Sequence, residues 1–155
     1  MNNNDILRKL RYIFQYSDDQ MMETFGLMEH VVSRSQVCAW LKGDDHAGFM
    51  QISDRNLALF LNGLIVRFRG KRDGKLPVTE SKLNHNIVFR KLKIALSLQA
   101  EDILSMLRKA NFRLSKHELS AFFRKPDNRH YRECKDQVLR NFLQGLSLER
   151  LPNKK

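Results

Sequence analysis

The chain has 155 residues, of which 42% are hydrophobic, so it can build an apolar core and is not expected to be disordered. Its net charge of +11 is uneven, because residues 1–82 carry +2 and residues 83–155 carry +9. This asymmetry favours contact between the second half and a polyanion, although a basic surface that only keeps the protein soluble gives the same composition. The first residues lack the regions of a secretion signal and no apolar run could cross a bilayer. We therefore expect a cytoplasmic protein without a membrane partner.

Four helices are predicted in the first half of the chain. The first covers residues 5–16, where Ile6, Leu10 and Ile13 recur at helical spacing. Each of the next three begins at a residue type that caps helices well, namely Ser17, Ser33, and Ser53 or Asp54. Alternating runs of strand length are absent, so the fold class is predicted to be all-α.

The second half repeats the first at an offset of 82 residues. Between residues 4–65 and 86–147, 13 of 62 aligned pairs are identical without a gap. The prediction is therefore two tandem copies of a four-helix unit, residues 1–68 and 86–155, joined by a polar linker over residues 69–85. Gly63 and Gly145 recur inside the fourth helix of each copy, where glycine is unfavourable, and this recurrence predicts close approach of another helix.

Three segments carry a resemblance to a known family: residues 60–64, Phe-Leu-Asn-Gly-Leu, residues 142–146, Phe-Leu-Gln-Gly-Leu, and residues 119–126, Leu-Ser-Ala-Phe-Phe-Arg-Lys-Pro. The chain resembles the YehS-like family of small bacterial proteins of unknown function over essentially its whole length. The resemblance implies a bacterial cytoplasmic protein with two tandem domains. It implies no activity.

Residues 32–43 resemble the recognition helix of phage-repressor-type helix-turn-helix proteins, although the connection before this helix is longer here. In that motif a capping serine starts a helix whose first polar residues reach base edges in the major groove. The resemblance implies an all-α unit with a helix-turn-helix-like core and the following roles. Bases would be read by Arg34, Ser35 and Gln36 in the first copy and by Lys116, His117 and Glu118 in the second, while Arg113, Arg124 and Lys125 would hold phosphates.

A basic cluster on the first helix recurs in both copies. Its members are Arg8, Lys9 and Arg11 in the first copy and Arg90, Lys91 and Lys93 in the second. These side chains could clamp phosphates, or they could form a solvated helix face whose aliphatic stems cover apolar surface.

Catalytic and metal-binding patterns are missing from the sequence. It has neither a glycine-rich phosphate loop nor a Gly-x-Ser-x-Gly motif, so we expect no enzyme activity and no cofactor. His130 and Cys134 are too few for a zinc site, so no metal is expected. Cys38 and Cys134 do not match between the copies, which excludes a duplicated disulfide and favours a reducing compartment.

The leading hypothesis is a protein that binds nucleic acid, with DNA preferred, mainly through its basic second copy. Two alternatives stay open: a helical adaptor that binds another protein, and an RNA-associated protein. The sequence does not determine the oligomeric state.

Overall fold

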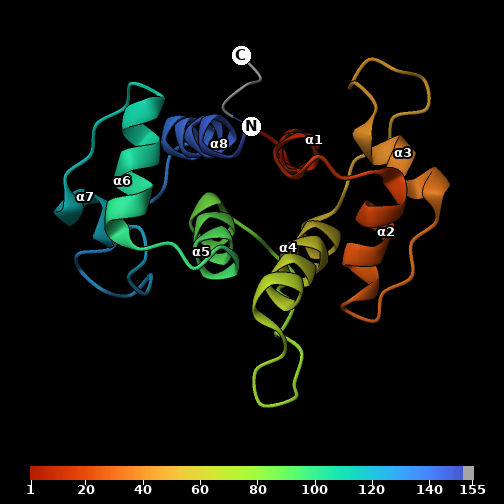
Figure 1. Cartoon of the computed structure of the whole chain (residues 1–155), viewed down its shortest axis with the longest axis horizontal. Helices are drawn as coiled ribbons and strands as arrows, with labels where there is room; N and C mark the ends of the chain where they lie inside the picture. The colour runs from red at the N-terminus through yellow and green to blue at the C-terminus, as the bar shows by residue number, and fades with distance from the viewer. Residues whose placement is uncertain (152–155) are drawn as a thin grey trace. The chain divides into compact units, whose positions relative to one another are not determined.

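The computed structural model describes residues 1–151, which contain eight helices in two compact units (Figure 1). The first unit, Met1–Leu83, holds α1 (Asn3–Phe14), α2 (Asp18–Gly26), α3 (Arg34–Leu41) and α4 (Asp54–Arg69). The second begins at Asn84 and holds α5 (His85–Ala95), α6 (Ala100–Lys109), α7 (Lys116–Ala121) and α8 (Asp136–Arg150). The predicted all-α class and the repetition of a four-helix unit are confirmed. No helix in these residues is both long and apolar enough to cross a membrane.

Helix starts follow the predicted caps. The hydroxyl oxygens of Ser17, Ser33 and Ser53 each accept the backbone N–H three residues ahead. Helix α1 begins at Asn3, two residues earlier than predicted, because the Asn2 side chain accepts the backbone N–H of Asp5 over 2.8 Å. The predicted helix starts are therefore correct wherever a serine provides the cap.

The two cores are built from matching positions with different side chains. In unit 1 the ring of Phe25 contacts those of Trp40 and Phe60 at centroid distances of 5.5 and 5.4 Å. In unit 2 the central ring is Phe89, which lies 4.6 Å from the ring of Phe142. Phe25 aligns with Leu107 and Phe89 with Leu7, so phenylalanine and leucine have exchanged places at these two buried positions.

A glycine marks the closest helix contact in each unit. A Cβ on Gly63 would lie 2.1 Å from the carbonyl oxygen of Thr24, and one on Gly145 would lie 2.0 Å from that of Met106. These contacts join α4 to α2 and α8 to α6. The predicted close approach of another helix is confirmed, since any side chain at either glycine would force the two backbones apart.

A buried asparagine ties the first helix of each unit to the end of the third helix and the loop beyond it. The Nδ2 of Asn4 donates to the carbonyl oxygens of Trp40 and Met50 over 2.8 and 3.0 Å, and its Oδ1 accepts the N–H of Ile52 over 3.2 Å. Asn86 repeats this arrangement with Phe122, Arg132 and Cys134. Every partner is shifted by the same 82 residues, so the two units share one backbone framework at this point.

Part of the segment between α4 and α5 is fastened to unit 1. The Nδ2 of Asn62, which is buried on α4, donates to the carbonyl oxygen of Val78 over 3.2 Å, and the N–H of Leu83 donates to Asp54 over 2.9 Å. The glycine-containing turn at its tip is closed by paired backbone hydrogen bonds between Arg72 and Lys75. Residues 69–85 are therefore polar, but hydrogen bonds hold this segment to α4 at two points.

Candidate nucleic-acid interface

The side chains at the third position of α3 and α7 serve their own helices. The Oε1 of Gln36 accepts the N–H of Ser33 over 2.9 Å, while the Ser33 hydroxyl accepts the N–H of Gln36 over 3.0 Å. Glu118 forms the same reciprocal pair with Ser115. The hydrogen bond from the Ser115 backbone lowers the pKa of Glu118. Two of the six residues expected to read bases thus satisfy backbone groups at a helix start.

The first residue of each of these helices is held by an ion pair to the preceding helix. Arg34 pairs with Asp19 and, over 3.6 Å, with Asp18. Lys116 pairs with Glu101 over 3.0 Å. Positions 34 and 116 correspond, as do positions 19 and 101, so the pair persists although both partners have changed. Ser35 and His117, the remaining two of these residues, are exposed.

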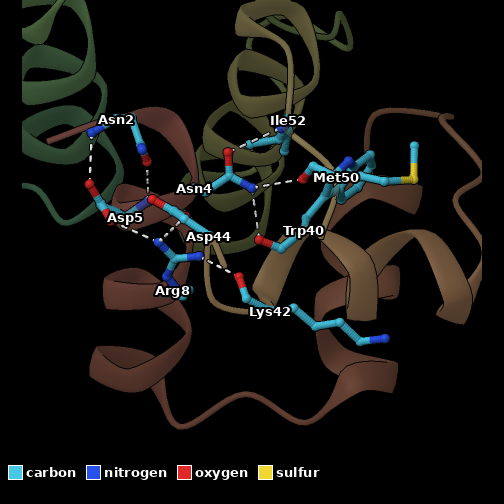
Figure 2. A network of polar contacts seen from close by, with 9 residues as sticks. All are labelled: Asn2, Asn4, Asp5, Arg8, Trp40, Lys42, Asp44, Met50 and Ile52. Atoms are coloured by element: carbon cyan, nitrogen blue, oxygen red, sulfur yellow. Dashed lines mark hydrogen bonds and ion pairs between the residues drawn. The ribbon is translucent and has the colours of Figure 1, made fainter. Parts of the chain in front are cut away.

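Arg8 on α1 lies in a polar network (Figure 2). Its guanidinium donates to the carbonyl oxygen of Lys42 over 2.7 Å and pairs with the carboxylates of Asp5 and Asp44 over 2.7 and 3.3 Å. Burial raises the pKa of Asp5, but the Asn2 backbone and Arg8 outweigh this effect and hold it below its ordinary value. Arg8 is therefore committed to contacts within unit 1.

The corresponding network in unit 2 lacks both carboxylates. Position 90 is again arginine, but Ile87 stands where unit 1 has Asp5 and Pro126 stands where it has Asp44. Arg90 is exposed. The charge that neutralises Arg8 has thus been removed around Arg90, while the cation itself is retained.

The lysines beside these arginines contribute less to the surface. Lys91 is only 7% exposed. Lys9 is half-buried, its ammonium lies 5.6 Å from the ring centroid of Tyr12, and desolvation lowers its pKa. Of the basic cluster on the first helices, Arg90 is the member best placed to meet an external anion.

Three further predicted residues are exposed around α7. Arg113 lies in the connection before this helix, and Arg124 and Lys125 lie in the loop after it. Among the described residues, none of these three side chains is held by a hydrogen bond or an ion pair. Arg124 and Lys116 line the same hollow in unit 2 as Lys93 of α5.

Sequence reasoning overlooked other members of this hollow, namely Ala100, Ser120 and Phe123. None of these residue types suggests a site by itself. The signal that could have found them is the change of charge between the copies, because Asp18 aligns with Ala100 at the same offset that revealed the repeat.

Both cysteines are free. Cys134 is buried beside Asn86, and burial raises the pKa of its thiol to about 12. Cys38 is partly buried on α3, with its sulfur 3.6 Å from the carboxylate of Asp18. Neither residue lies on the exposed basic surface of unit 2.

Comparison with known proteins identifies relatives over nearly the whole chain. The model of the family described as "Protein of unknown function (DUF1456)" matches twice, over residues 3–70 and 85–150. The chain is 42% identical over 149 residues to "Uncharacterized protein YehS" of Escherichia coli (strain K12), which covers 95% of each chain. No solved structure matches significantly. The tandem matches and the extent of this identity establish that the chain belongs to the DUF1456 family of proteins of unknown function.

Proposed function

We propose that the protein binds nucleic acid through the phosphate backbone and that unit 2 supplies the binding surface. The observation that carries this proposal is the selective loss of counter-charges in unit 2. Arg8 is held by Asp5 and Asp44, whereas around the matching Arg90 these two positions are occupied by Ile87 and Pro126.

An arginine that is already paired is a poor ligand for phosphate, because its existing partners must be given up first. Arg8 uses both terminal nitrogens of its guanidinium within unit 1. Arg90, Arg124 and Lys125 are exposed and have no comparable obligation among the described residues. Cations of this kind gain free energy from nucleic acid by releasing its condensed counterions, so affinity depends strongly on salt.

The binding mode favoured here is contact with the backbone, with little reading of bases. Helix α7 has only six residues, and Glu118 in its first turn is engaged with Ser115. Lys116, the first residue of this helix, forms only a weak, exposed pair with Glu101, and its ammonium is a point charge that suits phosphate. The Glu118 carboxylate has no donor to offer base edges, while phosphate contacts need no particular sequence.

The test is a fluorescence-anisotropy titration of the purified chain, freed of co-purifying nucleic acid, against random-sequence duplex DNA and RNA at two salt concentrations. Replacing both Arg90 and Arg124 by Gln should weaken binding about tenfold and lower the salt slope by about two, close to one unit for each lost phosphate contact. The matched control replaces Arg55 and Lys71, two exposed cations of unit 1, by Gln. It therefore removes as much positive charge as the Arg90 and Arg124 variant.

We expect the control variant to bind within about twofold of the unaltered protein, since its cations lie outside unit 2. Equal weakening of both variants would mean that net charge alone drives binding and would contradict a site on unit 2. Absence of binding to either nucleic acid at low salt would remove the proposal and leave the adaptor hypothesis. The ratio of DNA to RNA affinity decides which polymer is preferred.

A further inference from the structure

In unit 1 a carboxylate occupies the space between three helices. Asp18, the first residue of α2, pairs with Arg11 of α1 over 3.1 Å and with Arg34 of α3 over 3.6 Å. The sulfur of Cys38 lies 3.6 Å from the same carboxylate. The Asp18 side chain is 26% exposed, so this negative charge is partly buried between the helices.

In unit 2 the corresponding space is open. Lys93 stands in place of Arg11 and Lys116 in place of Arg34, but the residue at the position of Asp18 is Ala100. These residues line a hollow of about 430 Å³ together with Ser120, Phe123 and Arg124. The cations that hold a carboxylate in unit 1 are therefore retained around a cavity that contains none.

The charges around the hollow suit a doubly charged anion. Lys93, Lys116 and Arg124 contribute three positive charges, and Glu101 compensates one of them through an exposed pair in which both side chains are 71% accessible. Such an exposed pair is weak and yields easily to a better partner. The net charge of these four groups is +2, which matches the charge of about −1.5 to −2 on a phosphate monoester at neutral pH.

Besides the cations, the wall includes the polar Gln99 and Ser120 and one apolar side. The Phe123 ring lies beside Lys93, whose ammonium is 5.4 Å from the ring centroid, and Leu119 and Ala100 complete this side. Small-molecule sites commonly combine a few converging polar groups with an apolar lining, in cavities of roughly 300–1,000 Å³. An organic group attached to the phosphate would find an aromatic surface here.

We infer that this hollow, the α6–α7 pocket, binds a small phosphate monoester whose organic part is apolar or aromatic. The phosphate lies where Asp18 lies in unit 1, among Lys93, Lys116 and Arg124, and the organic part lies against Phe123. The pocket shares Arg124 with the proposed nucleic-acid surface but does not require that surface to function.

The decisive variant is Ala100→Asp, which restores the carboxylate found in unit 1. An acidic residue in the first turn of a helix is favourable, so this variant should fold normally. The matched control is Gln137→Glu, which adds the same charge at an exposed position in the first turn of α8, away from the pocket. Phenyl phosphate and inorganic phosphate are titrated into the full-length chain and followed by calorimetry and by amide chemical shifts.

We expect phenyl phosphate to shift the amide resonances of Ser120 and Phe123. It should bind the Ala100→Asp variant at least tenfold more weakly than the unaltered chain. Its affinity for the Gln137→Glu control should stay within twofold of that for the unaltered chain. Phe123→Leu, which introduces the residue of unit 1, should reduce the preference for phenyl phosphate over inorganic phosphate. Equal affinity of the Ala100→Asp and Gln137→Glu variants, or shifts confined to other elements, would overturn the inference.

Duplex DNA titrated against the same proteins separates the two proposals. Loss of phenyl phosphate binding in Ala100→Asp with DNA affinity equal to that of Gln137→Glu supports a distinct small-molecule pocket. Phenyl phosphate binding by a chain that binds no DNA supports the pocket and rejects the proposed function. DNA binding by a chain that binds no phenyl phosphate rejects the pocket alone.

Discussion

The side-chain nitrogen of Asn4 donates a hydrogen bond to the carbonyl oxygen of Trp40 over 2.8 Å, at the point where α3 ends. The same asparagine also binds backbone groups of Met50 and Ile52, so one buried amide fixes the course of the loop that follows α3. A buried polar side chain is stabilising only when its hydrogen bonds are satisfied, and here all three serve backbone groups that would otherwise lack a partner.

Replacement of this amide should be costly. Asn4→Ala leaves buried backbone groups unsatisfied, and we expect a loss of about 3 kcal/mol in the free energy of unfolding. Trp40 is the single tryptophan and is buried in unit 1, so its fluorescence during urea unfolding reports on this unit. Gln51→Ala, an exposed change in the same loop, should stay within about 0.5 kcal/mol. Similar values for the two variants would show that the amide is dispensable.

The interior glycines should not tolerate alanine. In an ordinary helix Gly→Ala is stabilising by about 1 kcal/mol, but a Cβ on Gly63 would lie 2.1 Å from the Thr24 carbonyl oxygen. We expect Gly63→Ala to lower the free energy of unfolding by about 3 kcal/mol, because α2 and α4 must separate. Gly26→Ala, where a Cβ meets nothing within 4 Å, should range from neutral to about 1 kcal/mol stabilising. A stabilising Gly63→Ala in the same urea titration would contradict the close contact.

Stability at high pH should depend on Cys134. The thiol of the unfolded chain ionises near its ordinary pKa of 9.0, whereas burial keeps the folded thiol protonated until about pH 12. The stability that the protonated thiol contributes is therefore fully present below pH 9. It is lost as pH rises toward 12, because the unfolded state then binds fewer protons than the folded state. Cys134→Val should lose less stability than the unaltered chain between pH 8 and pH 10 in urea unfolding followed by circular dichroism. Cys38→Val should lose as much stability over this pH range as the unaltered chain. An identical pH dependence of stability in all three proteins would refute the role of Cys134.

Substitution of Gln36 distinguishes its role in helix capping from a role in reading bases. Because its side chain accepts the N–H of Ser33, we expect Gln36→Ala to reduce stability by about 0.5–1 kcal/mol while duplex DNA affinity stays within twofold. The neighbouring exposed Ser35 provides the control, since Ser35→Ala should change neither quantity. A large loss of DNA affinity in Gln36→Ala at unchanged stability would restore the base-reading interpretation.

Local features of the sequence predicted the helices well. The serine caps at positions 17, 33 and 53 act on backbone groups three residues ahead, so the signal and its effect lie in the same short segment. The recurrence of Gly63 and Gly145 also predicted a helix contact correctly, because glycine is unfavourable inside a helix unless a neighbouring backbone leaves no room for a Cβ. The partner of each glycine could not be named from the pattern.

The candidate site was predictable only in part. The sequence showed where cations are retained between the copies, including Arg90, Lys116 and Arg124. It did not show that Gln36 and Glu118 cap their helices in place of pointing outward, because the helix-turn-helix resemblance assigned the same positions to bases. A glutamine or glutamate at such a position can either cap its helix or point toward a base, and the local backbone geometry decides which of the two it does.

By itself the sequence determined an all-α protein made of two copies of a four-helix unit, since hydrophobic spacing, caps and an ungapped repeat are properties of the chain read in order. Only the tertiary structure decided which charges meet. Asp18 neutralises Arg11 and Arg34 because three separate helices converge on it, and Ala100 leaves the matching cations around an open pocket for the same reason. Ion pairs between helices depend on distances in space, and spacing along the chain does not contain them.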